Sequence, residues 1–197
     1  MRIRSRLCMS ADGYITTPTG WPPQVVDPAY VPGESHGVPE FVATCEAALM
    51  GHTTFAPALT NDRWPWPTLQ VFVLASQRPA GTPDHVTVDS DPTRLLEQLR
   101  AANRGGDVHL IGGPRTIETF RALGALDKLE LVVLPFFVGG GMRLTEALDI
   151  DTGLTLDSSR ALPGGSVEIV YTVDNRGGVP QAREAGWAPA SQRFSAG

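Results

Sequence analysis

The chain has 197 residues and a formal net charge of -5, and 42% of its residues are hydrophobic. This length fits one domain that buries its core without disulfides or metals, and the acidic balance excludes the basic field of a nucleic-acid-binding protein. No stretch approaches the roughly 18 apolar residues of a membrane span, and no cleavable leader is recognisable. We therefore expect a cytoplasmic protein with a small-molecule partner, no membrane or nucleic-acid partner, no metal site, and reduced thiols at Cys8 and Cys45.

Short apolar runs bounded by Gly, Pro or Asp predict strands, and these runs alternate with helical patterns along most of the chain. Asp91 is a suitable N-cap for a helix that starts at Pro92. Such alternation predicts an α/β fold with a mostly parallel central sheet, flanking helices and antiparallel C-terminal strands. The expected strands are 3–9, 48–50, 71–75, 108–111, 129–137 and 167–173, and the expected helices are 38–46, 92–103 and 115–123.

Two segments lack this periodicity. Residues 16–37 are rich in proline and glycine and contain Trp21 and Tyr30. This segment is too long for an ordinary connection, and its composition is typical of a lid or binding loop. Residues 177–197 are rich in Gly, Ala and Pro and predict a tail that is either disordered or docked through its aromatic residues. We expect one domain over 1–176 followed by this tail.

The segment 108–116, VHLIGGPRT, predicts a strand, a glycine turn and the start of a helix. Glycines at the turn let backbone amides approach a pyrophosphate, and the helix directs the positive end of its dipole to the same place. A glycine pair at such a junction is also often only a tight connection. The candidate phosphate-binding residues of this segment are Ile111, Gly112, Gly113, Pro114, Arg115 and Thr116.

Two further junctions have the same character. In 49–55, LMGHTTF, a buried strand leads to Gly51 and then to the hydroxyls of Thr53 and Thr54, which bind phosphate or simply cap a helix. In 74–78, LASQR, Ser76 and Arg78 follow a strand, and surface solvation is the alternative there. Ligands of open α/β sheets bind outside the carboxyl ends of the strands, so all three junctions should gather at one site that suits a dinucleotide.

Several segments, taken in order, resemble one family. SADGYI at 10–15 is similar to the family's S-x-D-G-x-I signature, and LMGHTTF at 49–55 is similar to its G-R-x-T-[YF] signature. Trp64-Pro65 followed by 71–78 resembles the family's W-P pair and the strand with S-x that comes after it. The stretch 111–148 is similar to its G-G, G-L-x-D-E-L and P-x-x-x-G-x-G pattern. The chain, over roughly residues 2–173, thus resembles the reductase domain of the bifunctional riboflavin-biosynthesis deaminase-reductase and its stand-alone relatives, which share the dihydrofolate reductase fold. The zinc signature of the deaminase half is absent.

The resemblance implies a dihydrofolate-reductase-like domain, a homodimer, and NADPH bound across the carboxyl edge of the sheet. It places Gly51, Thr53 and Thr54 against the phosphates, the 112–116 turn against the pyrophosphate, and Ser76 and Arg78 at the adenosine end. It also implies a cis peptide between the two glycines of the turn. The nicotinamide is expected beside Ile15, and Ile15, Trp21 and Tyr30 are the candidate substrate-binding residues, with core packing as the alternative for the two aromatic side chains.

Two departures from the family pattern affect the chemistry. His52 replaces an arginine that contacts the 2′-phosphate, and a neutral imidazole supplies less charge, so NADPH is favoured but NADH stays open. The carboxylate of folate reductases falls near Gly37, which cannot protonate a substrate. Asp12 is the candidate catalytic residue, either as a proton donor or, since Asp-Gly is a common turn pair, as a structural residue. Nearby Glu34, His36 and Glu40 are further candidates for the missing acid.

The expected reaction is hydride transfer from the nicotinamide to an electrophilic carbon of a small heterocycle, with the protein supplying orientation and a proton. The substrate is either a 5-amino-6-ribosylaminopyrimidine, as in riboflavin synthesis, or a pterin-like compound. One alternative is a nucleotide-binding protein of the same fold without reductase activity. Another is a reductase of a secondary-metabolite or exogenous compound, which the long loop at 16–37 mildly favours.

Overall fold

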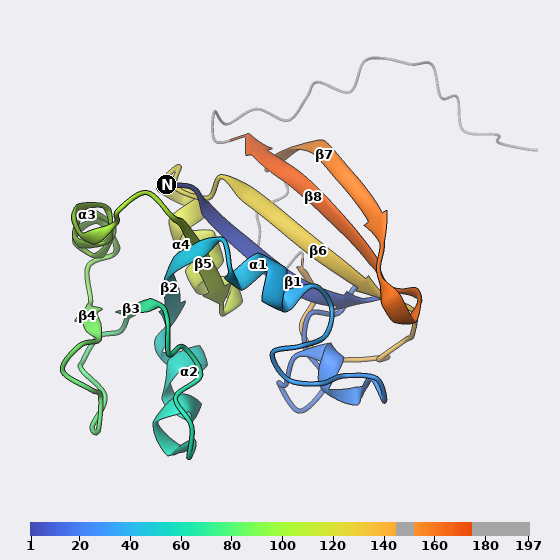
Figure 1. Ribbon diagram of the computed structural model, residues 1–197, viewed down its shortest axis with the longest axis horizontal. Helices are drawn as coiled ribbons and strands as arrows, with labels where there is room; N and C mark the ends of the chain where they lie inside the picture. The colour runs from blue at the N-terminus through green and yellow to red at the C-terminus, as the bar shows by residue number, and fades with distance from the viewer. Residues whose placement is uncertain (145–151, 175–197) are drawn as a thin grey trace, which may run out of the picture.

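The structure is a computed structural model, and it describes residues 1–144 and 152–174; the predicted tail at 177–197 lies outside these residues. One eight-stranded sheet with the order β4-β3-β2-β5-β1-β6-β8-β7 forms its centre (Figure 1). The strands are β1 (Ile3–Ser10), β2 (Cys45–Gly51), β3 (Gln70–Leu74), β4 (Thr87–Asp89), β5 (Asp107–Gly112), β6 (Lys128–Leu134), β7 (Gly153–Ala161) and β8 (Val167–Asp174). Strands β1 to β6 pair in parallel, whereas β8 is antiparallel to both β6 and β7, as the sequence predicts.

Helices lie on both faces of the sheet, and the alternation of side chains along the strands separates two cores. On one face, Leu95 and Leu99 of α3 (Pro92–Ala102) and Ile117 and Phe120 of α4 (Pro114–Ala122) pack on the sheet with no exposed surface. On the other face, Phe55 of α2 (His52–Phe55) and the two tryptophans of the 61–69 segment cover β2 and β3. The helices are α1 (Val38–Val42), α2 (His52–Phe55), α3 (Pro92–Ala102) and α4 (Pro114–Ala122), with short 3-10 helices η1 (Pro23–Val26), η2 (Ala56–Thr60) and η4 (Pro163–Gly165).

The helix predicted at 92–103 forms, and its predicted cap is confirmed. The Asp91 side chain accepts hydrogen bonds from the backbone N–H groups of Thr93 and Arg94 at 2.9 and 3.3 Å. These bonds satisfy two of the N–H groups that have no partner within the helix. Because α3 supplies three leucines to the core, its position fixes the outer strands β3 and β4 against the rest of the sheet.

The helix predicted at 38–46 is wrong in its second half. Only α1 is helical, and Cys45 begins β2 instead of lying in a helix. The apolar spacing from Val38 to Cys45 fits a helix locally, but the following run is buried between β3 and β5. It pairs with β5 from Cys45 and with β3 from Ala47. The Glu46 carboxylate then accepts hydrogen bonds from the backbone N–H groups of Arg104 and Gly106, which ties β2 to the segment before β5.

Three further differences concern strand ends and edges. Strand β6 ends at Leu134 instead of residue 137, because Pro135 cannot donate to a strand ladder. Strands β4 and β7 were not predicted. Both lie at edges of the sheet, and β7 carries exposed side chains after Gly153, so it lacks the apolar alternation that signals a strand. Within residues 1–144 and 152–174, no helix is long and apolar enough to cross a membrane.

Candidate cofactor and substrate site

The three predicted strand-to-helix junctions meet at one edge of the sheet. The ends of β2, β3 and β5 are neighbours, with Met50 paired to Gly112 and Gly51 paired to Leu74. Because the strands are parallel, the segments that follow them leave the sheet on the same side (Figure 1). The residues that the sequence singled out at 51–54, 76–78 and 111–116 are therefore brought together.

Two of these junctions are in direct contact. A Cβ atom on Gly51 would lie 2.3 Å from Oγ1 of Thr116 and 4.0 Å from the backbone N of Gly113. A Cβ atom on Gly113 would lie 3.7 Å from Oγ1 of Thr54. Thr116 is buried, so its hydroxyl cannot simply turn away into solvent. Only glycine at position 51 lets the turn after β5 pack this closely on the turn after β2.

The glycine turn after β5 is open on its outer side. Gly112 has a φ of +130°, a conformation that favours glycine, and its peptide bond to Gly113 is cis, as the resemblance implies. A Cβ atom on Gly112 would meet nothing within 4 Å. Gly113 is the N-cap of α4 and no side chain caps this helix, which starts at Pro114. Open backbone at a nine-residue helix N-terminus fits the phosphates of a nucleotide cofactor.

The neighbouring side chains offer the polar groups that a nucleotide needs. His52, Thr53 and Arg115 are exposed, and Thr54 is half-buried. The N-cap of α2 is Gly51, and no side chain caps this helix either, so the alternative in which a threonine hydroxyl caps it is not observed. Ile111 packs in the core beside α2 and holds the end of β5 in place.

Ser76 and Arg78 lie past the end of β3, at the outer part of the same edge. Ser76 is exposed. The Arg78 guanidinium donates hydrogen bonds to the carbonyl oxygens of Val86 and Pro83 at 3.0 and 2.7 Å, and thereby closes the loop between β3 and β4. A guanidinium has five N–H donors, so Arg78 keeps donors and a full positive charge for a ligand at this edge.

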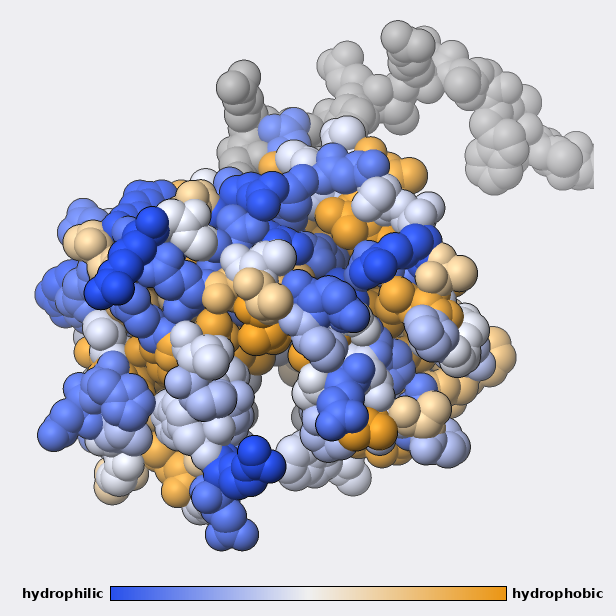
Figure 2. Space-filling model, viewed as in Figure 1, coloured by the Kyte–Doolittle hydropathy of each residue, from blue (hydrophilic) through white to orange (hydrophobic). Residues whose placement is uncertain are grey.

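The molecular surface is hollowed between the part that carries α2 and the part that carries the 16–37 loop (Figure 2). Two of the predicted substrate residues, Trp21 and Tyr30, belong to this loop, and Ile15 directly precedes it. Ile15 is buried, and its N–H donates to the carbonyl oxygen of Met142 at 2.8 Å. Trp21 is 59% exposed, whereas Tyr30 is half-buried and stacks on His36. The structure thus leaves only Trp21 of the two aromatic residues free to meet a ligand without rearrangement of the loop.

The start of the 16–37 loop is fixed by the glycine bend after β6. The Thr16 hydroxyl accepts a hydrogen bond from the backbone N–H of Met142 at 2.8 Å. Gly141 has a φ of +115°, and a Cβ atom there would lie 2.1 Å from the carbonyl oxygen of Thr16. The glycines at 139–141 therefore shape a bend that packs against the start of the loop.

Asp12 holds the same bend. Its carboxylate accepts hydrogen bonds from Ser10 Oγ at 2.5 Å and from the backbone N–H groups of Val138 and Gly139 at 3.1 and 2.8 Å. The Ser10 hydrogen bond, helped by those of the backbone, lowers the pKa of Asp12 to about 2. At neutral pH this side chain is ionised and has no proton to give. These contacts favour the structural alternative for Asp12, which would position the bend next to Ile15.

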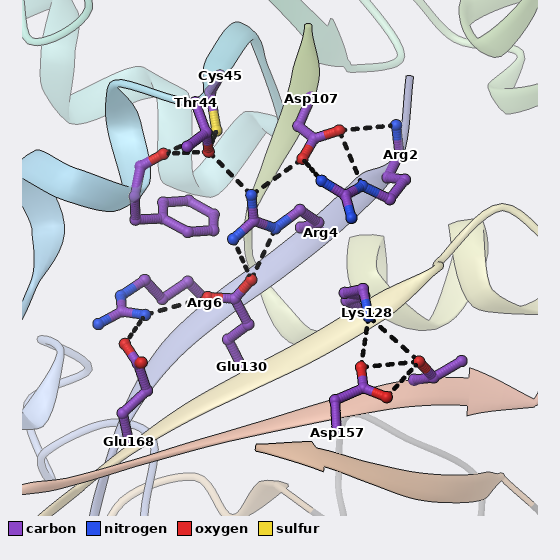
Figure 3. A network of polar contacts seen from close by, with 12 residues as sticks. Arg2, Arg4, Arg6, Thr44, Cys45, Asp107, Lys128, Glu130, Asp157 and Glu168 are labelled. Carbon is purple, nitrogen blue, oxygen red and sulfur yellow. Dashed lines mark hydrogen bonds and ion pairs between the residues drawn. The ribbon is translucent and has the colours of Figure 1, made fainter. Parts of the chain in front are cut away.

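A buried ion-pair network that the sequence analysis missed lies on the sheet face that carries α1 (Figure 3). Arg6 Nη1 contacts Glu168 Oε2 at 2.6 Å and Glu130 Oε2 at 3.1 Å, and the Arg6 side chain is only 6% exposed. Arg4 contacts Glu130 and, on its other side, Asp107. The arginines at alternate positions of β1 point to one face of the sheet. This alternation is visible in the sequence and could have indicated a charged cluster on that face. A cavity of about 320 Å³ opens beside this network.

A second cavity, of about 360 Å³, lies between the 27–37 part of the loop and the turn after β7. Its lining includes Asp27, Glu34, His36, Glu40 and Arg160. Glu34 and Glu40 are exposed, whereas the His36 side chain is 5% exposed and lies within 3.1 Å of Asp27. Of the three candidates for the missing acid, only His36 is thus held in a fixed position by a partner.

Comparison with known proteins agrees with this geometry. The family model of the RibD C-terminal domain matches residues 2–167. The fold is similar to that of a protein of Shewanella sp. PV-4 described as a riboflavin biosynthesis protein, with a TM-score of 0.71 and 22% identity over 88% of this chain and 99% of that chain. It is also similar to the Thermotoga maritima diaminohydroxyphosphoribosylaminopyrimidine deaminase/5-amino-6-(5-phosphoribosylamino)uracil reductase, with a TM-score of 0.65 and 16% identity over 88% of this chain and 56% of that longer chain. Dihydrofolate reductase from Enterococcus faecalis, solved with NADP(H), gives a TM-score of 0.61 and 15% identity over 88% of this chain and 96% of that chain.

Proposed function

Because the chain belongs to the RibD C-terminal domain family, we propose that it is an NADPH-dependent reductase that transfers hydride to a small heterocyclic substrate. The substrate is of the 5-amino-6-ribosylaminopyrimidine or dihydrofolate type. The observation that carries this proposal is the contact between the two glycine junctions, in which Gly51 packs on Thr116 and Gly113 on Thr54. This contact sets the turns after β2 and β5 side by side, so that groups from both could bind the linked phosphates of one dinucleotide.

Each end of the cofactor has residues that suit it. The open turn at 112–116 and the uncapped N-terminus of α4 would hold the pyrophosphate, with Thr53 and Thr54 beside it. His52, Ser76 and Arg78 would lie at the adenosine end. When bound, the cofactor supplies a hydride, and the protein contributes binding, orientation and a proton. Substrate would lie against the 16–37 loop, which follows Ile15 and carries Trp21 and Tyr30.

The preference for NADPH over NADH rests on positive charge near the 2′-phosphate. His52 stands where the family has an arginine, but Arg78 and the exposed Arg115 both lie at the same edge of the sheet. Either Arg78 or Arg115 could supply the positive charge of the missing arginine if its side chain reaches the 2′-phosphate. NADH is the alternative cofactor, and a competitive titration separates the two.

The test is a titration with NADPH and NADH, followed by oxidation of the bound cofactor at 340 nm. The acceptor panel contains 5-amino-6-(5-phosphoribosylamino)uracil, its dephosphorylated form, dihydrofolate and a set of exogenous carbonyl and imine compounds. We expect NADPH to bind more tightly than NADH and one panel member to support turnover. Binding without turnover across the panel would favour a nucleotide-binding protein without reductase activity, and the absence of binding would contradict the proposal.

We also propose that the protein is a homodimer and that β7 lies in the interface. This strand is at the edge of the sheet, its side chains after Gly153 are exposed, and Leu156 is 57% exposed. A long exposed edge strand is usually covered, because its unpaired backbone and apolar side chains otherwise promote aggregation. Sedimentation equilibrium should give twice the mass of the chain, and a monomer mass at micromolar concentration would contradict this assignment.

A further inference from the structure

His36 has an unusual backbone and a buried side chain. Its φ is +58°, and among residues 1–144 and 152–174 it is the one non-glycine residue with a positive φ. Its carbonyl oxygen accepts a hydrogen bond from Arg6 Nη2 at 2.5 Å, so the buried ion-pair network holds the backbone there. Side chains rarely adopt this conformation, and where they do a functional constraint is a common reason.

The ring of His36 is held on one nitrogen and has no partner on the other. Nε2 lies 3.1 Å from Oδ2 of Asp27, and the Tyr30 ring stacks on the imidazole with centroids 5.9 Å apart. Nδ1 is buried and has no hydrogen-bond partner. A buried polar atom without a partner destabilises the folded state, so its retention calls for an explanation. A ligand atom that pairs with Nδ1 would supply one.

The position of His36 in the fold matches this explanation. It lines the 360 Å³ cavity together with Asp27, and α1 begins two residues later at Val38. Gly37, between them, has a φ of +69°, and a Cβ atom there would lie 2.8 Å from Arg6 Nη2. Asp27 interacts electrostatically with Cys8, which lies two residues before the end of β1. The pair is thus near the carboxyl end of a central strand, where the substrate is expected.

Other proton donors near this end of the sheet are unsuited to the role. Burial, with a contribution from Asp27, raises the pKa of Cys8 to about 12, whereas the pKa of Asp12 is lowered to about 2. Glu34 and Glu40 are exposed, so water solvates their carboxyl groups. Histidine, by contrast, is the side chain most suited to proton transfer near neutral pH.

We propose that His36, oriented by Asp27, donates the proton that accompanies hydride transfer; this assignment rests on the proposed reductase function. The hydride brings an electron pair to the carbon of a C=N or C=O bond, and the π pair moves to the heteroatom. That atom takes the proton from Nδ1 of the protonated ring. The neutral ring keeps its Nε2–H bond to Asp27 and is reprotonated by solvent through the cavity. Asp27 is a positioning residue, because it acts through the ring.

The test compares His36→Asn with His85→Gln, a substitution of an exposed histidine that packs on Trp64 at the far side of the sheet. Asparagine tolerates a positive φ, so the fold should be kept. With the panel compound that supports turnover, we expect kcat of His36→Asn to fall about 100-fold or more, while the NADPH dissociation constant changes less than about threefold. His85→Gln should change neither quantity by more than about threefold.

Two further variants separate proton donation from structural support. His36→Gly accommodates the backbone without strain, and added imidazole should restore at least about a tenth of the wild-type kcat, which a merely structural histidine would not allow. Asp27→Asn should lower kcat about tenfold with little change in KM, and the double variant with His36→Asn should lose no more than the single histidine variant. Asp27→Glu, which keeps the carboxylate, should restore part of the loss.

Ring nitrogen resonances give a readout that does not depend on turnover. In ¹⁵N-histidine-labelled protein with NADP⁺, addition of the turned-over compound should shift the Nδ1 resonance of His36 and leave that of His85 unchanged. An active wild-type enzyme whose His36→Asn variant keeps kcat within threefold overturns the His36 assignment and leaves the reductase function standing. A wild-type protein that oxidises NADPH with no panel compound contradicts the reductase function and the assignment with it.

Discussion

Gly51→Val is expected to weaken NADPH binding by at least about 100-fold, equivalent to about 2.7 kcal/mol of binding free energy. A Cβ atom at this position would lie 2.3 Å from Oγ1 of the buried Thr116, so the turns after β2 and β5 must move apart. In the proposed site both turns hold one cofactor, so a shift of either would remove phosphate contacts that depend on close backbone approach. Fluorescence titration with NADPH measures the loss, with circular dichroism as the check that the variant is folded.

Two other glycines serve as controls for this substitution. A Cβ atom on Gly106 would lie 2.7 Å from Cβ of Glu46, before β5 and at the opposite end of the strand from the site. Gly106→Ala should therefore lower the melting temperature without changing the NADPH affinity of the folded protein. A Cβ atom on Gly113 would make only an ordinary contact, 3.7 Å from Oγ1 of Thr54. Gly113→Ala should therefore keep the melting temperature, but the added methyl group at the turn should still weaken NADPH binding about tenfold. If Gly51→Val and Gly113→Ala both bound NADPH with wild-type affinity, the assignment of the cofactor site would be refuted.

Arg6→Met should lower the free energy of unfolding by about 3 kcal/mol, the low end for breaking a buried ion pair, because Glu130 and Glu168 each lose one of their two arginine partners. The Arg6 side chain is 6% exposed and bridges Glu130 and Glu168, whose side chains are 3% and 9% exposed. Removal of the guanidinium leaves Glu130 with Arg4 alone and takes away the hydrogen bond to the His36 carbonyl. Urea denaturation followed by circular dichroism measures the change.

Arg160→Met is the matched control, because Arg160 pairs with the same carboxylate. Its Nε lies 2.5 Å from Oε1 of Glu168, but its side chain is 57% exposed and solvent can replace it. The expected loss is about 1 kcal/mol or less. Equal losses for the two arginines would show that burial does not set the strength of this network, contrary to the argument made for Arg6.

Local patterns predict most of the parallel part of the sheet. The runs that form β1, β3, β5 and β8 carry apolar side chains on at least one face and end at turn residues. The cap at Asp91 and the leucine spacing of α3 are contained within one segment. The same local view fails at Cys45 and in β7. In each case the deciding contacts come from strands far away along the chain, and the residues themselves fit a helix or a loop equally well.

The candidate site divides in the same way. The glycine turn at 112–113, the Gly51 junction and the hydroxyl at Ser76 are visible as short motifs, since a strand that delivers a glycine to a helix start is a local event. The position of Asp27 relative to His36 is not visible, because the loop that joins them has no periodicity. Sequence reasoning weighed His36 beside two glutamates, and only its burial against Asp27 and Tyr30 distinguishes it from them.

The sequence by itself determined the α/β class, most of the alternation of strands and helices, and the three junctions that suit a nucleotide, because each depends on residues close together in the chain. The tertiary structure alone decided that Gly51 lies against Thr116 and that Arg6 pairs with Glu130 and Glu168, partners that are 124 and 162 residues away. Which strands become neighbours sets these contacts, and that choice depends on the packing of the whole sheet. Charge pairing and close backbone approach follow from it.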